Sequence, residues 1–342
     1  MSLKTSSSLF KRSVRSVEAQ VGLVSNNEEL ILNPACLRPL AADIAPEIWN
    51  IGTALHKVEE TTTRELDGYL IVLDSPDLPL HISASTNLVY LSGDIATLEA
   101  TAQDKRWTLF GNLGLFFRFA LSLLETGHGI YSFHASSTYN PRTNELLVFV
   151  GGPGSGKTVL LLEAVLHQGH QLFSAEMTHV RLTAAGCQFY KGALFDNIRV
   201  GTLVEDFPEL LGARTAELAS IAARWEKKYA VNLSAYQTAG DELINSAISL
   251  IFPQIESGRK GIVINDHLPD HLVSRLLYNN LSEKLRESLH LYDGALVYDF
   301  PEAPQQREKR KHFVSAFMKL PQLQRRRSVL SGVQDCGKAL LP

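Results

Sequence analysis

Short apolar runs separated by turn-forming residues mark the first third of the chain. They cover residues 30–32, 69–73, 80–82 and 88–91, and they are interrupted by Pro76, Pro79 and Gly93. Apolar runs of this length between prolines and glycines are typical of β-strands. The pattern predicts a small N-terminal α+β region, residues 1–110, that contains a sheet.

The spacing of apolar residues then changes to that of a helix. Between residues 112 and 126, one face carries Leu113, Phe116, Phe117, Ala120, Leu121 and Leu124. Apolar positions three or four residues apart are typical of an amphipathic helix that faces a hydrophobic core. This helix opens the larger of the two expected regions, residues 111–342.

Two strands joined by a turn are predicted next, at residues 130–136 and 146–150, and a further helix is expected to end at Gln168. Two later apolar runs, residues 262–264 and 295–298, also read as strands. Helical patterns lie between them. Alternating strands and helices of this kind favour an α/β architecture.

A glycine-rich sequence, Gly-Gly-Pro-Gly-Ser-Gly-Lys-Thr, connects the second strand of the pair to its helix. It satisfies G-x-x-x-x-G-K-[ST], the pattern of a phosphate-binding loop, in the strand–loop–helix context that the pattern requires. That context disfavours a merely structural glycine turn. Backbone N–H groups and the helix N-terminus would face the phosphates, Lys157 would bridge the β- and γ-phosphates, and Thr158 would bind Mg²⁺. The predicted nucleotide-binding residues are Gly151, Gly152, Pro153, Gly154, Ser155, Gly156, Lys157 and Thr158.

Such a loop occurs in switches, motors, transporters and kinases, so the flanking segments must indicate the reaction. Residues 133–136 read Phe-His-Ala-Ser, and residues 169–176 read Gly-His-Gln-Leu-Phe-Ser-Ala-Glu. Together with the loop, they resemble the HPr kinase/phosphorylase family and its wider HPr-kinase-like group, which includes kinases that tailor lasso peptides. The resemblance extends from His134 to Arg181.

Two further segments match the same family in part. Residues 197–199, Asn-Ile-Arg, lie where the family has a Glu-Ile-Arg magnesium-binding segment. Residues 227–229, Lys-Lys-Tyr, resemble a lysine-bearing strand of the HPr-kinase-like proteins.

The resemblance implies a P-loop kinase of phosphoenolpyruvate-carboxykinase-like α/β fold with a mixed sheet. It implies transfer of the γ-phosphoryl group of ATP to a hydroxyl, typically that of a serine. It places His134 beside the loop and Glu176 on the second acid of the family's paired aspartates. The catalytic residues implied are His134, Lys157 and Glu176, and the magnesium ligands implied are Thr158, Glu176 and Asn197.

The chain departs from the family pattern at two positions. Ala175 stands where the first aspartate of the pair is expected, and Asn197 stands where the family has glutamate. An acid near the acceptor hydroxyl serves as base or orienter in phosphoryl transfer, so Glu176 would carry that role alone. The loss of the pair puts the reverse, phosphorolytic reaction in doubt. It also leaves open an alternative, a nucleotide-binding regulatory module whose catalysis is impaired.

Each candidate also has a structural interpretation. His134 could be a core histidine, and Glu176 could be an exposed strand end. Asp266 follows an apolar run and imitates a magnesium-binding Walker B aspartate, although turn chemistry before a proline is favoured. Arg199 and Arg214 could stabilise charge in the transition state or simply lie on surface loops.

Composition narrows the class of protein. The chain has 342 residues, of which 45% are hydrophobic and 20% charged, as in ordinary globular proteins. Its net charge is −3, but residues 305–327 contain eight Lys or Arg against the single acid Glu308. We interpret this part of a basic helical C-terminal segment, about residues 305–342, as a solvated face; a patch for an anionic partner stays open. The near-neutral charge disfavours a nucleic-acid partner. The basic segment also has only two aromatic residues, Phe313 and Phe317, which are few for a surface on which single-stranded bases stack.

Cysteines and hydropathy indicate the compartment. Cys36, Cys187 and Cys336 are too widely spaced for a disulfide framework or a zinc site. The most apolar stretch, residues 113–124, contains Arg118 and is too short to span a bilayer. The basic N-terminus, residues 1–15, is interpreted as a frayed end rather than an organelle presequence. We therefore expect a cytoplasmic protein without a membrane partner.

The sequence as a whole predicts a Mg-ATP-dependent kinase. Its cofactors would be ATP and Mg²⁺, and its acceptor a hydroxyl on a peptide, a small protein or a metabolite. The resemblance leaves a homo-oligomer open.

Overall fold

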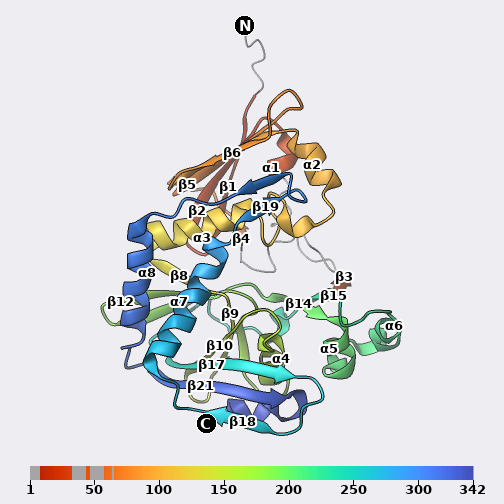
Figure 1. Cartoon of the computed structure of the whole chain (residues 1–342), viewed down its shortest axis with the longest axis vertical. Coiled ribbons are helices and arrows are strands. Elements are labelled where there is room, and N and C mark those ends of the chain that lie inside the picture. The colour runs from red at the N-terminus through yellow and green to blue at the C-terminus, as the bar shows by residue number, and fades with distance from the viewer. Residues whose placement is uncertain (1–7, 33–43, 47–57, 64, 342) are drawn as a thin grey trace.

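A computed structural model describes residues 8–32, 44–46, 58–63 and 65–341. It shows an α/β protein built of several mixed sheets. Two lobes are stacked along the long axis, with the N-terminal strands in the upper lobe and the glycine loop in the lower (Figure 1). None of the helices in these ranges is long and apolar enough to cross a membrane. Cys36 lies outside the described residues, whereas Cys187 and Cys336 are buried and free.

A six-stranded mixed sheet forms the upper lobe, in the order β4-β1-β2-β5-β7-β6. The pairs β2–β5 and β5–β7 are parallel, and the outer pairs are antiparallel. Its strands are β1 (Phe10–Ser16), β2 (Ala19–Ser25), β4 (Val58–Glu60), β5 (Gly68–Asp74), β6 (His81–Ala84) and β7 (Leu88–Gly93). Three helices pack against it: α1 (Glu28–Leu32), α2 (Ile95–Thr101) and α3 (Leu115–His128).

Most sequence predictions for this lobe are confirmed. The runs at 69–73, 80–82 and 88–91 form β5, β6 and β7, and the amphipathic pattern at 112–126 forms α3. The strand predicted at 30–32 is wrong, because these residues end helix α1. The Asn27 side chain accepts a hydrogen bond from the backbone N–H of Glu29, and acids in the first turn favour the helix dipole.

The expectation of a frayed basic N-terminus is wrong for residues 10–15, because they lie in a strand. Phe10–Ser16 is strand β1, which pairs with β2 over its whole length. Arg12 and Arg15 contact Glu60 and Glu59 of the neighbouring strand β4 at 3.1 and 2.5 Å. Residues 1–7 lie outside the described part of the chain.

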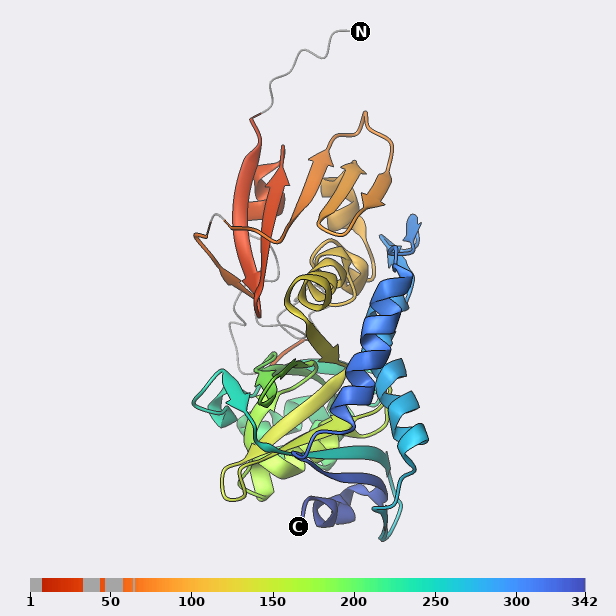
Figure 2. The same cartoon turned by 90° about the vertical axis from the view of Figure 1, so that its left-hand side faces the viewer.

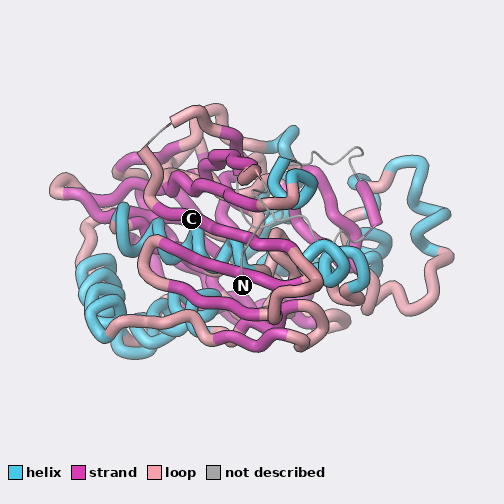
Figure 3. Tube along the Cα trace, turned by 90° about the horizontal axis from the view of Figure 1, so that it is seen from above, coloured by secondary structure: helices cyan, strands magenta, loops and turns pink. Residues whose placement is uncertain are grey.

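The main sheet of the lower lobe has the order β11-β9-β10-β17-β21-β18. Its central strands β10, β17 and β21 are parallel, and the others are antiparallel to their neighbours. The strands are β9 (Ala135–Asn140), β10 (Glu145–Val150), β11 (Gln171–Ser174), β17 (Ala247–Glu256), β18 (Ile262–Asn265) and β21 (Leu323–Gly332). Figure 3 shows the strands of the molecule from above.

Two smaller sheets flank the main one. The first has the order β16-β13-β12-β8, from β8 (Ile130–Phe133), β12 (Thr178–Thr183), β13 (Gly186–Tyr190) and β16 (Glu242–Ile244). The second has the order β14-β15-β3, from β3 (Ile44–Pro46), β14 (Phe195–Arg199) and β15 (Lys228–Asn232). Helices α5 (Val200–Glu205) and α6 (Thr215–Ala219) follow β14.

Strand β10 separates two hydrophobic cores and carries the glycine loop at its end. Leu146, Val148 and Val150 pack into one core with residues of helices α7 and α8, while Leu147 and Phe149 pack into the other with α4. Burial of both faces explains why the strand is an unbroken apolar run. The loop therefore starts from a fixed point between two packed layers.

Helix α4 (Lys157–Leu162) begins directly after the loop and passes into a π-helical turn, Glu163–His167, so the predicted helix to Gln168 is confirmed within one residue. The strand predicted at 130–136 is divided at His134 into β8 and β9, which belong to different sheets.

The C-terminal part of the chain connects the lobes. Helix α7 (Asp270–Arg286) rises beside the lower sheets, the hairpin β19 (Leu289–Leu291) and β20 (Leu296–Tyr298) packs into the upper core, and α8 (Pro304–Phe317) returns (Figure 2). The Tyr292 N–H donates to the carbonyl of Trp107 at 2.9 Å. The two lobes thus share the chain segment 270–317, and the fold is not a simple succession of two regions.

The expected helical character of residues 305–342 is correct only in part. Helix α8 ends at Phe317, and Leu323–Gly332 is the inner strand β21. Two of its three arginines are paired locally, because Arg326 contacts Asp270 and Arg327 donates to Asp266 at 2.6 Å. Paired charges allow a basic sequence to lie inside a sheet, which the charge pattern alone does not indicate.

Candidate active site

A cleft of about 490 Å³ lies over the glycine loop, between the two lobes. The loop residues 152–158 form its floor. One wall comes from β14, α5 and the turn that precedes β15, and the opposite wall comes from α7 and the segment between α2 and α3. Its lining includes His134, Glu176, Asn197 and every predicted loop residue except Gly151.

The glycine loop is shaped by a close approach to strand β17. Gly156 has φ +96°, and a Cβ atom there would lie 2.4 Å from Ile255. The Ile255 N–H donates to the carbonyl of Ser155 at 3.0 Å. Only glycine satisfies both the left-handed backbone and the space at position 156. The loop is therefore held against the sheet at the point where α4 begins.

Lys157 lies folded into the loop. Its ammonium group donates to the carbonyls of Gly151 at 2.6 Å and Gly152 at 3.2 Å. Burial lowers the pKa of Lys157, and the negative charges of Glu176 and Asp196 offset only part of this effect. The side chain thus supplies a buried positive charge at the base of the cleft.

Thr158 contacts an acid that the sequence analysis missed. Its hydroxyl donates to the carboxylate of Asp196 on β14 at 2.8 Å, and Asp196 is only 2% exposed. Burial, with the charge of Glu176, raises the pKa of Asp196 to about 7. The only signal for this residue was its position next to Asn197, in the segment that matches the family's magnesium-binding one.

Asn197 also lines the cleft, and its Oδ1 atom is buried without a hydrogen-bond partner among the residues described. A buried acceptor left unsatisfied costs free energy, so it indicates a missing donor or cation. Thr158 and Asp196 bring a hydroxyl and a carboxylate oxygen together in the cleft, and Asn197, the next residue of β14, also lines it. These oxygen types are ligands that Mg²⁺ prefers. No cluster of three or more His, Cys, Asp or Glu suited to a metal occurs in the described ranges.

His134 lies between two carboxylates. Its Nε2 is 3.6 Å from Oε2 of Glu176, and its Nδ1 is 3.0 Å from Oε1 of Glu283 on α7. The His134 carbonyl accepts a hydrogen bond from the Asn280 side chain at 3.0 Å. Burial alone would lower the pKa of His134, but hydrogen bonds to the two carboxylates outweigh it and raise the pKa. The two carboxylates therefore favour the protonated form of the imidazole, and both acids gain a partner.

Glu176 follows β11 and keeps 23% of its side chain exposed, on the cleft. Burial would raise the pKa of Glu176, but its contact with His134 and the charge of Lys157 outweigh it and lower the pKa. Its neighbour Ala175 is buried in the lower core, and its N–H donates to the carbonyl of Ala193 at 2.9 Å. The cleft thus has one ionised carboxylate at the place where the family has a pair.

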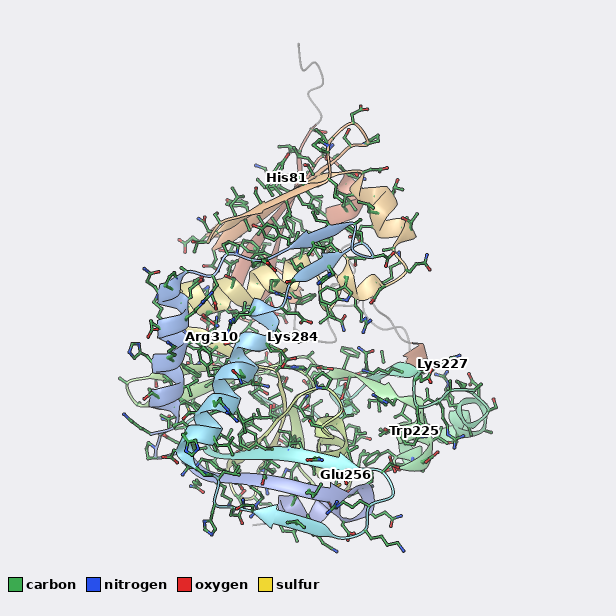
Figure 4. The ribbon with its side chains drawn as sticks, in the orientation of Figure 1. His81, Trp225, Lys227, Glu256, Lys284 and Arg310 are labelled. Atoms are coloured by element: carbon green, nitrogen blue, oxygen red, sulfur yellow. The ribbon has the colours of Figure 1, made fainter. Side chains whose placement is uncertain are left out.

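Several basic residues surround these acids. Arg106, Lys228 and Lys284 line the cleft, from the upper lobe, β15 and α7 respectively. Arg199 lines it as well and donates to the carbonyl of Trp225 at 2.9 Å. Figure 4 shows Lys284 near the junction of the lobes. A cleft with this many cations suits a polyanion.

Two other candidates do not contribute. Asp266 follows β18, the antiparallel edge strand, and pairs with Arg327 outside the cleft, so the Walker B interpretation is wrong. Arg214 contacts Glu217 at 3.3 Å and lies over the ring of Tyr229. It is not part of the cleft lining.

Neither the comparison with protein-family models nor the comparison with curated proteins finds a match for this chain.

The chemistry of the site therefore rests on its own geometry. The glycine loop, the buried Lys157 and the Thr158–Asp196 pair line the cleft together with Glu176 and its partner His134. This arrangement can hold a nucleoside triphosphate with a divalent cation and can accept a proton from a second substrate.

Proposed function

We propose that the protein is a Mg-ATP-dependent phosphotransferase with an HPr-kinase-like P-loop fold, which transfers the γ-phosphoryl group to a hydroxyl acceptor. The observation that carries this proposal is the position of Glu176. Its carboxylate is ionised, oriented by His134, and faces the same cleft as the glycine loop. A loop that binds only phosphate needs no such acid.

Each residue of the loop region has a defined task. Backbone N–H groups of Gly152, Gly154, Ser155 and Gly156 would bind the phosphates, and Lys157 would exchange its two carbonyl partners for phosphate oxygens. Thr158, Asp196 and Asn197 would hold the magnesium ion, which neutralises charge on the phosphates. Asp196 replaces the missing family glutamate as the carboxylate ligand, so the departure at Asn197 does not remove the metal site.

The acceptor side is formed by Glu176 and His134. The Glu176 carboxylate would accept the proton of the acceptor hydroxyl as the phosphoryl group moves. His134 would act as a positioning residue, because it contacts Glu176 and is fixed in turn by Glu283. Lys228 and Lys284 are placed to neutralise charge on the transferred group.

The acceptor would be a peptide, a small protein or a metabolite, and the open side of the cleft leaves room for any of them. We place this activity in the cytoplasm, where the free thiols Cys187 and Cys336 persist and ATP is available. The runner-up is a nucleotide-binding module without turnover, which Ala175 favours because it removes one acid from the site.

Nucleotide binding is the first property to test. Thermal unfolding would be followed with Mg-ATP, Mg-GTP and Mg-pyrophosphate on the wild type, Lys157→Ala and, as a matched control, the exposed Lys311→Ala. Ligand at a hundred times its Kd stabilises by about 2.7 kcal/mol, so a clear rise in Tm is expected for wild type and control. Lys157→Ala should not show this rise in Tm. Equal shifts in all three proteins, or none in the wild type, would overturn the proposal.

A further inference from the structure

Trp225 is a large aromatic side chain on the wall of the cleft rather than in a core. It remains 37% exposed, lines the cleft and belongs to none of the hydrophobic clusters of the described residues. It lies beside α5, well away from Lys284 on the other wall (Figure 4). Its exposure within the cleft leaves the indole accessible to a ligand.

The indole is seated on a glycine. A Cβ atom at Gly201, in α5, would lie 2.4 Å from Cδ2 of Trp225 and 2.6 Å from both Cε2 and Cε3. Cδ2 is a fusion atom whose in-plane neighbours surround it, so it can be the nearest atom only when approached from above the ring. The Gly201 backbone therefore packs against one face of the indole, and any larger residue would displace it.

The turn that carries Trp225 is braced by four interactions. Arg199 donates to the Trp225 carbonyl at 2.9 Å, and the N–H groups of Val200 and Gly201 donate to the carbonyls of Lys227 and Arg224, both at 2.9 Å. Arg224 also pairs with Glu205 at 2.6 Å. These contacts fix the backbone of the turn that carries the indole, and Trp225 stays 37% exposed in the lining of the cleft. A rigid aromatic surface in a wet cleft has the properties of a stacking platform.

We propose that Trp225 is the platform on which the base of the bound nucleotide stacks, which defines the ligand as a nucleotide rather than a simple polyphosphate. This inference rests on the proposed function, because it places the base relative to phosphates on the glycine loop. Trp225 lies on the same wall of the cleft as β14, which carries Asp196 and Asn197. The stacked base and the metal would therefore lie on the same side of the cleft. Thr202 and Asp206 of the same wall offer polar groups for the edges of a purine.

The acceptor is the less suitable occupant of this platform. Glu176 and His134, which would receive the acceptor, approach from β11 and the β8–β9 junction rather than from α5. A stacked base and an acceptor at Glu176 then occupy different parts of one cleft. Both could be present at once, as a ternary transfer requires.

The test compares two ligands that share phosphates and differ in the base. Binding of Mg-ATP and of Mg-tripolyphosphate would be measured by calorimetry on the wild type, Trp225→Ala, Trp225→Phe and the control Trp107→Phe, together with tryptophan emission. Trp107 lies against His290 in the upper lobe and is not part of the cleft lining. Base stacking on an aromatic ring corresponds to a loss of about 5- to 100-fold in affinity on removal of the ring.

We expect Trp225→Ala to lower the affinity for ATP by that factor and to leave the affinity for tripolyphosphate unchanged. Trp225→Phe should restore part of the lost ATP affinity. ATP should quench emission in the wild type and in Trp107→Phe but not in Trp225→Phe, whereas tripolyphosphate should quench in none. Equal loss of both ligands in Trp225→Ala, or unchanged ATP affinity, would overturn the platform and leave the proposed function standing. Failure of the wild type to bind either ligand would overturn both. If Trp225→Ala does not fold, the quenching pattern and Trp225→Phe decide.

Discussion

The hydroxyl of Thr158 donates a 2.8 Å hydrogen bond to the buried carboxylate of Asp196. This bond ties the first turn of α4, directly after the glycine loop, to strand β14 across the cleft. Asp196 also lies near Glu176, whose charge contributes to the raised pKa of Asp196. The pair thus couples the phosphate-binding loop to the wall that would hold the metal and the base.

Removal of the Asp196 charge should stabilise the protein without ligand and weaken its response to magnesium. The pKa of Asp196 is raised in the folded state to about 7, so its ionisation costs stability progressively as pH rises from about 4 to 7. Asp196→Asn should therefore gain on the order of 1 kcal/mol over wild type above pH 7, and little at pH 4. Chemical unfolding at several pH values measures this difference.

Asp196→Asn should bind ATP with almost the same affinity in the presence of magnesium and of a chelator, because it lacks the carboxylate that would bind the metal. Asp77→Asn, at an exposed acid outside the cleft, is the control. A destabilised Asp196→Asn with intact magnesium dependence would show that this acid is structural.

Local patterns predicted the parts of the site that are contiguous in sequence. The glycine loop, its strand β10 and its helix α4 could be located because their spacing is fixed within a few residues. The placement of Glu176 and His134 in one cleft agrees with the motif order. Residues that act through distant contacts gave no such signal: Glu283 is 149 positions from His134.

Charge was the least reliable guide to structure. The basic segment 305–327 was interpreted as a solvated helical face, yet Arg310 is among the most buried side chains and part of the segment forms an inner strand. Counting charges does not show which of them have partners. Trp225 was not predicted either, because its exposure depends on the glycine at 201 and on the turn that holds it.

Gly156→Ala should disable the loop. The φ of +96° and the predicted 2.4 Å contact with Ile255 each oppose a side chain, so a loss of about 1–3 kcal/mol in stability is expected, together with loss of nucleotide binding. The double variant Gly156→Ala/Ile255→Gly would remove the side-chain contacts at 2.4 and 2.5 Å but not the backbone strain. Full recovery in that double variant would show that space alone, and not φ, requires glycine.

The charge on His134 should depend on Glu283. Both carboxylates raise the pKa of His134 above its usual 6.5, so their contribution to stability is complete below that pH and is lost as pH rises through the raised pKa. At the acid end it is lost below about pH 4, because the pKa values of Glu176 and Glu283 are lowered from 4.5. NMR titration should show a lower pKa of His134 in Glu283→Gln. An unchanged pKa there, or an equal decrease in Glu287→Gln, would contradict the assigned contact.

Arg310 should be needed for stability rather than for an anionic partner. It is 1% exposed and contacts Glu125 at 2.8 Å and Glu302 at 2.7 Å, which joins α8 to α3 (Figure 4). Arg310→Leu would leave the buried Glu125 without its cation, whereas Glu302 keeps Arg307, and should cost about 3–5 kcal/mol. The double variant Arg310→Leu/Glu125→Leu should cost less. Its neighbour Lys311→Ala, at an exposed site, should change stability by at most about 0.5 kcal/mol.

Glu176 should serve chemistry and not nucleotide binding. The most direct measurement is ADP formation from Mg-ATP, with and without serine-containing peptides, on wild type and Glu176→Gln, with ATP affinity determined on the same samples. We expect slow turnover by the wild type, faster turnover with a suitable hydroxyl acceptor, and a loss of about 100-fold or more in Glu176→Gln at similar affinity. Equal binding by both proteins without turnover in either, or turnover that does not depend on Glu176, would contradict this expectation.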